Sequence, residues 1–300
     1  INFENRVERG IKMYVSVAVM DTGIFRHMDF DTRIAGFADF VGRKKYLYDD
    51  NGHGTHVAGI IAGSGKGSNG KYRGIAPDTF LVSVKVLDKS GNGKIENVVE
   101  AAGWIIENKS AMNIRVVNIS FGTRAKMENG PAIETGEDDY ALIMAVEKMW
   151  DSGIVVVAAA GNNGPGNTSV TAPGISKKII TVGAFDDKNF FSGRGPTREC
   201  IVKPEVVVTG SNIIACNNHQ GRYSSKSGTS MAAPVVSGAV ARLIKNNPDI
   251  TPKEVKIWMK SCCKKINVPS EKQGWGVLDI RKFVTAVSYT HLTLPTTSRV

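Results

Sequence analysis

The sequence predicts an α/β fold in which a mostly parallel central sheet carries helices on both of its faces. Short apolar segments rich in valine and isoleucine alternate along the chain with longer segments whose apolar residues recur at helical spacing, and no segment is repeated. Strands without a polar face are typical of a parallel sheet covered on both sides. The alternation of strands with helices is typical of the same architecture.

The elements of the N-terminal half are predicted from their composition. Strands are expected where β-prone apolar residues are continuous, and helices where apolar residues recur every three or four positions. The stretch at 29–50 is mixed in composition and predicts no regular element. In chain order, the expected elements are a strand at 14–20, a helix at 53–62, a strand at 80–87, a helix at 95–106 and a strand at 116–119.

The C-terminal half continues the alternation with shorter strands and a closing group of helices. Residues 288–300 are rich in threonine and serine and lack periodicity, and they predict a disordered or cloning-derived tail. In chain order, the expected elements are a helix at 142–150, strands at 154–160, 179–184, 206–208 and 213–215, and helices at 235–243, 252–261 and 278–284.

The bulk composition is that of an ordinary globular protein, with 42% hydrophobic and 22% charged residues. The length of 300 residues allows one large α/β domain or two small ones. No apolar run reaches the roughly 18–20 residues needed to cross a bilayer, so no membrane partner is expected. The net charge of +10 is scattered along the chain without a nucleic-acid motif. We interpret it as a solvated basic surface rather than a nucleic-acid site.

The cysteines and the N-terminus bear on the compartment. Cys200, Cys216, Cys262 and Cys263 form no metal-binding pattern, and adjacent cysteines rarely bridge each other. Free thiols are therefore predicted, and they leave the redox compartment open. The chain begins at Ile1 without a signal peptide, which predicts a processed or trimmed form.

Residues 227–234 (SGTSMAAP) place Ser230 just before the apolar helix expected at 235–243. Free backbone N–H groups and the macrodipole at a helix start favour negative charge. Such a position suits a nucleophile whose reaction forms an oxyanion. The alternative interpretation is that the serine and threonine only cap the helix.

Asp21 and His53 lie at two other places where a site could form. Asp21 directly follows the first expected strand, and sites gather at the carboxyl ends of strands in open α/β sheets. The alternative is a turn or capping role. His53 lies between two glycines that allow close backbone approach at a helix start. His56 follows about one turn later and is interpreted as a packing residue, while His27 and His219 are expected in loops or at the surface.

Peptide hydrolysis by a serine requires a nucleophile, a histidine that takes its proton, a carboxylate that orients the histidine, and donors for the oxyanion. Ser230, His53 and Asp21 supply the first three groups. Asn162 follows the strand expected at 154–160 and offers a side-chain N–H, while the Ser230 backbone N–H offers a second donor. Asp21 and Asn162 follow strand ends, and His53 and Ser230 lie at helix starts. We therefore expect these four residues to meet at one rim of the sheet.

Three stretches that hold these residues resemble the subtilisin-like serine proteases, or subtilases. They are residues 17–24 (VAVMDTGI), 51–59 (NGHGTHVAG) and 228–234 (GTSMAAP). The resemblance implies a subtilisin-like catalytic domain at 1–287, a serine endopeptidase that cuts peptide bonds in proteins through an acyl-enzyme. It also implies that Asp21, His53 and Ser230 form the catalytic triad, and that Asn162 belongs to the oxyanion hole.

The resemblance also implies where an extended substrate lies. Two backbone edges would flank the peptide and pair with it as an added strand, which gives affinity with little sequence demand. A third segment would line the pocket for the residue before the cut. Because these segments hold no acid, we expect broad specificity with a preference there for large apolar or aromatic residues. The residues are Gly91, Asn92, Gly93, Ser120, Phe121 and Gly122 for the edges, and Gly161, Asn163 and Gly164 for the pocket.

No cofactor is required for the chemistry that the resemblance implies. Subtilases commonly hold structural calcium, and Asp29 falls where one calcium ligand could lie. The glycine-rich loop at 63–74 is shorter than the usual loop that supplies the remaining ligands. A structural calcium ion at Asp29 is therefore an expectation drawn from the resemblance alone.

The implied partners are protein or peptide substrates, together with a pro-segment or an inhibitor. The resemblance favours an extracellular location, while the absence of a signal peptide and the free cysteines leave a cytoplasmic location open. The alternative function is a catalytically silent pseudoprotease that binds peptides without cutting them, because a fold by itself does not guarantee activity.

Overall fold

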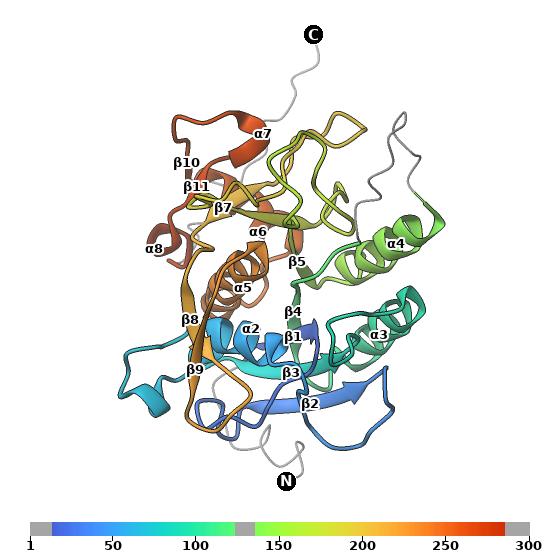
Figure 1. Cartoon of the computed structure of the whole chain (residues 1–300), viewed down its shortest axis with the longest axis vertical. Coiled ribbons are helices and arrows are strands. Elements are labelled where there is room, and N and C mark those ends of the chain that lie inside the picture. The colour runs from blue at the N-terminus through green and yellow to red at the C-terminus, as the bar shows by residue number, and fades with distance from the viewer. Residues whose placement is uncertain (1–13, 124–135, 286–300) are drawn as a thin grey trace.

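The computed structural model describes residues 14–123 and 136–285, so the tail predicted at 288–300 lies outside the described residues. Within the described residues, a nine-stranded sheet forms the centre of the molecule, and helices cover both of its faces (Figure 1). In this sheet, all neighbouring strand pairs but one run parallel. The predicted α/β class with a mostly parallel central sheet is confirmed.

The strand order places the first strand of the chain well inside the sheet. This strand, β1, is buried at every position, as its unbroken apolar composition predicts. From one edge to the other, the sheet consists of β10 (Cys263–Lys264), β11 (Val277–Leu278), β7 (Val206–Val208), β6 (Ile180–Ala184), β5 (Val155–Ala159), β4 (Ile114–Ile119), β1 (Ser16–Asp21), β3 (Phe80–Lys85) and β2 (Ile34–Asp39).

The helices divide between the two faces according to the side chains that β1 presents to each. Val17 and Val19 pack in one core with α2 and α5, while Ala18 and Met20 pack in a second core with α3 and α4. No helix in the described ranges has the length and apolar character needed to cross a membrane. The helices are α2 (His53–Ala62), the 3-10 helix η1 (Lys66–Ser68), α3 (Ile95–Asn108), α4 (Glu137–Asp151), α5 (Thr229–Asn246), α6 (Pro252–Ser261), α7 (Ser270–Gln273) and α8 (Ile280–Phe283).

The register of the parallel strands brings the ends of several strands to one edge. Met20 of β1 pairs with Ile119 of β4, so Asp21, the last residue of β1, lies beside Ser120, the first residue after β4. Asp21 also pairs with Lys85, the last residue of β3. Because carboxyl ends of parallel strands share an edge, this edge is where a site is expected.

Strand β2 was not predicted, because the stretch at 29–50 was interpreted as irregular. Its sequence, IAGFAD, has small residues and no clear alternation, and its first five residues are only half-buried. It forms the sheet edge and pairs with β3 alone. A strand whose side chains are small and partly exposed depends on its neighbour for stability, and its own composition gives a weak signal.

The strand predicted at 213–215 forms outside the central sheet. It is β8 (Ile213–Cys216), which pairs in antiparallel fashion with β9 (Tyr223–Lys226), an unpredicted strand that is polar throughout. The hairpin packs on α2, where the buried His56 ring contacts the carbonyl oxygens of Ile213 and Ser224 through Nε2, at 3.1 and 3.0 Å. Burial lowers the pKa of His56 to about 4, so the ring is neutral, and His56 is a packing residue as expected.

Helix α2 and the end of β1 approach each other closely because both carry glycine at the contact. A Cβ atom added to Gly54 would lie 2.1 Å from the Gly23 carbonyl oxygen and 3.1 Å from the Asp21 Cβ. Gly23 itself has a φ of +107°, a conformation that favours glycine. The composition of these two turns therefore fixes how near α2 can come to Asp21.

Replacing Gly54 with alanine is expected to lower the free energy of unfolding by at least about 2 kcal/mol, because the new methyl group would overlap a backbone carbonyl. The matched control is Gly103→Ala in α3, where the added Cβ meets nothing within 4 Å. That variant is expected to be up to about 1 kcal/mol more stable, through helix propensity. Urea denaturation measures both, and equal stability of Gly54→Ala and wild type would contradict the close approach.

Candidate active site

Asp21 and His53 form a hydrogen-bonded pair at the end of β1. The His53 Nδ1 lies 2.8 and 3.0 Å from the two carboxylate oxygens of Asp21. The Asp21 side chain is fully buried, and a quarter of the His53 side chain is exposed. The Thr22 backbone N–H donates to Asp21 Oδ1 at 2.8 Å. The structure therefore brings together two of the residues that the sequence predicted to meet.

The environment of His53 shifts its pKa in two opposing ways. Burial is the largest effect and lowers the pKa, because it disfavours the charged ring. The charge and hydrogen bond of Asp21 raise it, the Asp49 carboxylate adds to this, and Lys226 opposes it. The carboxylates prevail, so the pKa of His53 lies above the ordinary 6.5. The ring is neutral, and able to accept a proton, only at pH values above that raised pKa.

Asp49 holds the start of α2 against β1, a role that the sequence analysis missed. Its Oδ1 accepts from the Thr22 hydroxyl at 2.9 Å and from Gly52 N at 2.8 Å, while Oδ2 accepts from Thr55 N at 2.9 Å. Backbone N–H groups at a helix start lack partners within the helix. The signal was an aspartate shortly before a glycine-rich helix start, where a carboxylate satisfies these groups.

Ser230 lies in the first turn of α5 and is linked to Ser120 by two hydrogen bonds. The Ser230 hydroxyl donates to the Ser120 carbonyl oxygen at 2.8 Å, and the Ser120 hydroxyl donates to the Ser230 carbonyl oxygen at 3.0 Å. Within the described residues, the Ser230 hydroxyl bonds to Ser120 and not to His53. Pro234 explains the second bond, because a proline has no N–H to occupy the Ser230 carbonyl four residues earlier.

Asn118, near the end of β4, extends this link back into α5. Its Nδ2 donates to the Ser120 hydroxyl at 2.9 Å, and its Oδ1 accepts from the Ser237 hydroxyl at 2.8 Å. All these side chains but that of Ser230 belong to buried residues. The chain of bonds fixes β4 to both the first and the third turn of α5. The sequence analysis missed Asn118, since a lone asparagine within an apolar strand gives no sign of its partner.

Asn162 is tied to the residue that precedes Ser230. Its Oδ1 accepts from the Thr229 backbone N–H at 2.9 Å and from the Thr229 hydroxyl at 3.0 Å. Because a backbone N–H can only donate, the amide oxygen must face Thr229, and the amide nitrogen remains as a donor. Gly228 has no side chain where a Cβ would lie 3.1 Å from that nitrogen. The structure thus places Asn162 beside the start of α5.

The predicted substrate-binding segments all follow strands that end at the same edge. Residues 91–93 are exposed and lie in a turn after β3. Residues 120–122 directly follow β4; Ser120 is buried and Gly122 is exposed. Residues 161–164 follow β5 and pack on the next loop, since Gly164 N donates to the Phe191 carbonyl at 2.9 Å. Their placement is compatible with substrate binding, which stays a prediction.

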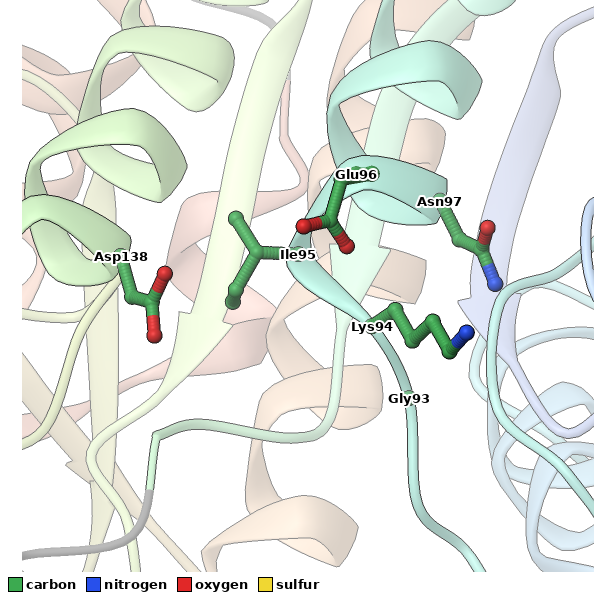
Figure 2. A pocket seen from close by; sticks show the side chains of 6 residues that line it. All are labelled: Gly93, Lys94, Ile95, Glu96, Asn97 and Asp138. Carbon is green, nitrogen blue, oxygen red and sulfur yellow. The ribbon is translucent and has the colours of Figure 1, made fainter.

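A hollow of about 620 Å³ opens beside the first of these segments. Gly93 lines it, and Figure 2 shows Ile95 directed between the starts of α3 and α4, with Glu96 on one side and Asp138 on the other. The hollow therefore begins where the predicted substrate edge ends. Its lining is Gly93, Lys94, Ile95, Glu96, Asn97 and Asp138.

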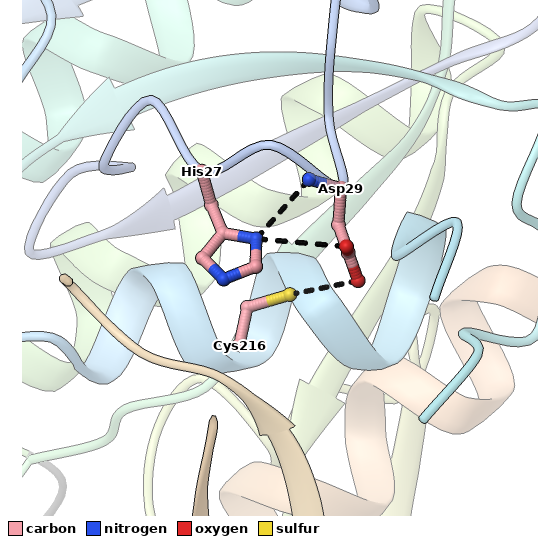
Figure 3. A group of neighbouring side chains, drawn as sticks. All are labelled: His27, Asp29 and Cys216. Atoms are coloured by element: carbon pink, nitrogen blue, oxygen red, sulfur yellow. Dashed lines mark hydrogen bonds and ion pairs between the residues drawn. The ribbon is translucent and has the colours of Figure 1, made fainter. Parts of the chain in front are cut away.

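Asp29, the predicted calcium ligand, lies in a buried cluster with His27 and Cys216 (Figure 3). Its carboxylate accepts from Gly67 N at 2.8 Å and from the Tyr223 hydroxyl at 3.0 Å. It also accepts from the Gly65 N–H and the Cys216 thiol. Calcium requires six to eight oxygen ligands. The neighbours of Asp29 are hydrogen-bond donors instead, so this arrangement does not fit a calcium ion.

The other members of the cluster are also satisfied by hydrogen bonds. His27 Nδ1 accepts from Asp29 N at 3.1 Å, and its Nε2 contacts the Arg222 carbonyl oxygen at 3.1 Å. Burial lowers the pKa of His27 and raises that of the Cys216 thiol, so both are neutral. His27 was expected in a loop or at the surface, and it lies in the loop after β1 but is buried there. The four cysteines are free, as predicted.

Comparison with known proteins agrees with these motifs and with the fold. The model of the subtilase family matches residues 13–276. The serine protease AprX of Bacillus subtilis (strain 168) is 42% identical over an alignment of 274 positions, which covers 82% of this chain and 60% of that protein. Subtilisin DY of Bacillus licheniformis is 33% identical over 268 residues, 89% of each chain.

The solved structures include a cold-adapted subtilisin-like serine proteinase with a TM-score of 0.69 and 30% identity, which covers 88% of this chain and 86% of that one. The chain spans less than two thirds of the length of AprX. Its own fold, its three motifs and the match over most of its length agree with one another. The chain therefore belongs to the subtilase family of serine proteases.

Proposed function

We propose that the chain is a serine endopeptidase that hydrolyses peptide bonds in proteins through an acyl-enzyme, with Asp21, His53 and Ser230 as its triad. The observation that carries the proposal is the 2.8 Å contact between His53 Nδ1 and the buried Asp21 carboxylate, at the edge of the sheet where Ser120 binds Ser230. Family membership supports the same chemistry.

The proposed acylation begins with a rotation about the Cα–Cβ bond of Ser230, which moves its hydroxyl from the Ser120 carbonyl to His53. Asp21 holds the Nδ1 proton, so Nε2 is the atom that takes the proton of the hydroxyl. The serine oxygen attacks the substrate carbonyl, and the imidazolium returns its proton to the leaving amine. Water then releases the acyl group by the same steps in reverse.

The proposed oxyanion donors are the Asn162 amide nitrogen and the Ser230 backbone N–H. The amide oxygen of Asn162 is engaged by Thr229, which orients its NH2 group and costs no reorganisation during the reaction. The backbone N–H lies in the first turn of α5, where the helix macrodipole favours negative charge. Both donors therefore favour the transition state over the neutral carbonyl.

The proposed substrate is an extended segment of a protein, held between residues 91–93 and 120–122. A pro-segment or an inhibitor would occupy the same edges. Gly161, Asn163 and Gly164 line the proposed pocket for the residue before the cut. The proposed location is extracellular, as the family resemblance favours, and the alternative is cytoplasmic. No cofactor takes part in any of these steps.

Ser230 is expected to react with a fluorophosphonate probe, and Ser230→Ala is expected to abolish labelling and to lower casein hydrolysis by several orders of magnitude. Ser227→Ala, three residues earlier at an exposed position, is the control and should retain both. Labelling is read by mass spectrometry of the modified peptide. A folded wild type that resists the probe and leaves casein intact would favour the silent peptide-binding alternative.

Asn162→Ala is expected to lower kcat about 10²–10³-fold with little change in KM, because it removes a donor that acts on the oxyanion. Asn162→Asp separates this role from structural support. It keeps an oxygen for the Thr229 N–H but loses the NH2 donor, and it should lower kcat at least as much. Asn167→Ala, at an exposed position in the same loop, should leave kcat unchanged. Full activity of Asn162→Asp would refute the assignment.

Cleavage is expected to be fastest after large apolar or aromatic residues, because the proposed pocket residues include no acid to pair with a basic side chain. The backbone of residues 190–192 lies against Gly164 and adds no acidic side chain there. A panel of peptides that differ only in the residue before the cut, compared by kcat/KM, measures the preference. Cleavage after lysine that equals or exceeds cleavage after phenylalanine would contradict it.

A further inference from the structure

Lys85 is a buried cation whose three bonds all lie beside the candidate site. Its side chain is 1% exposed. Its ammonium donates to the Thr22 carbonyl oxygen and to Asp50 Oδ1, both at 2.7 Å, and to the Leu87 carbonyl oxygen at 2.9 Å. An ammonium has three N–H donors, so all of them are used. Burying such a charge is costly unless it is fully paired, as it is here.

The bonds of Lys85 join the two chain segments that carry Asp21 and His53. Thr22 directly follows Asp21, and Asp50 precedes His53 by three residues. Lys85 is also the residue of β3 that pairs with Asp21 across the sheet. Residues of odd number in β1 and β3, such as Val19 and Leu81, face the core that contains α2. The Lys85 side chain therefore leaves the sheet on the face where His53 lies.

We propose that Lys85, with Asp50, is a positioning residue that sets the geometry of the Asp21–His53 pair. The ammonium fixes the Thr22 carbonyl, which limits how the chain turns after Asp21. Through Asp50, it also fixes the segment that leads into α2. This inference rests on the proposed function for its kinetic consequence, but its geometric part concerns the Asp21–His53 contact alone.

Asp49 complements Lys85 and does not replace it. Asp49 binds the Thr22 hydroxyl and the first N–H groups of α2, whereas Lys85 binds the Thr22 carbonyl and the carboxylate of the next residue, Asp50. The two neighbouring carboxylates thus accept from different donors, Asp49 from neutral hydroxyl and N–H groups and Asp50 from the ammonium. Without the ammonium, the Thr22 carbonyl would lose its buried donor and Asp50 its only ion pair among the described residues.

The proposal predicts a specific change in the titration of His53. The charged groups that act on the ring are Asp21 from β1 and Asp49 before α2, which raise its pKa, and Lys226 from β9, which lowers it. If the turn after Asp21 and the segment before α2 relax, the carboxylates move away from the ring. The carboxylates then raise the pKa of His53 less, while burial still lowers it, so the pKa falls.

The test replaces Lys85 with methionine, which keeps the buried stem and removes the charge. Because a misplacement of about 1 Å at a catalytic group can cost about 10²-fold, kcat is expected to fall by about that factor, with KM within about two-fold. The acid limb of the kcat/KM profile should move to lower pH. The pKa of His53, measured by NMR on the imidazole protons, should fall as well.

Lys203→Met is the matched control. Lys203 is equally buried, at 0% exposure, and pairs with Glu205 at 2.7 Å, but it lies beside β7, four strands from β1. Burial lowers the pKa of Lys203 to about 8, so this lysine too is held in an environment that disfavours its charge. Loss of this lysine should destabilise the fold while the folded protein keeps its kcat, its pH profile and the pKa of His53.

Each outcome decides between the proposals. Lys85→Met with the kcat and the His53 pKa of wild type would overturn the positioning role. A wild type without hydrolytic activity would overturn the proposed function, while the NMR titration would still test the contact. If Lys85→Met does not fold, Asp50→Ala serves instead, because Asp50 is 40% exposed and its loss spares both carbonyl bonds. It should shift the pKa of His53 in the same direction by less, and an unchanged pKa would again overturn the proposal.

Discussion

The approach of α2 to the end of β1 is the constraint on which the candidate site depends. Two backbones meet where neither Gly23 nor Gly54 carries a side chain, and a helix start is buried against a strand end. Such an approach would leave polar backbone groups without water, so partners must be supplied locally. Asp49 supplies acceptors to the helix, and the contact between His53 and Asp21 becomes available as a result.

Much of this arrangement could be predicted from the sequence, because its signals are local. The strand before Asp21 and the helix that begins at His53 show their periodicity and their glycines within a few residues. The supporting contacts could not be predicted in this way. Asp49 bonds to Thr22, 27 residues away, and Asn118 bonds to Ser237, 119 residues away. Strand β9 was missed for a similar reason, since its polar sequence is stabilised by the partner strand β8.

The buried Asp29 illustrates how one physical requirement can be met in two ways. A carboxylate removed from water must be compensated by a cation or by hydrogen-bond donors. The family resemblance suggested the cation, whereas the chain folds its glycine-rich segment so that Gly65 and Gly67 direct their N–H groups at the carboxylate. A thiol and a phenol from the β8–β9 hairpin complete the set. The resemblance therefore pointed to a residue that needs compensation, but it did not determine the partner.

Pro234 gives the helix that carries Ser230 one permanently open position. Since no amide proton exists at residue 234, the ladder of α5 can never close over the Ser230 carbonyl, whatever the solvent or temperature. The Ser230 carbonyl is therefore available to the Ser120 hydroxyl because residue 234 is proline, and no backbone N–H of that residue competes for it. A proline, which usually weakens a helix, here leaves a carbonyl free to bond outside it. The Ser120 hydroxyl uses that carbonyl and attaches the first turn of α5 to the end of β4.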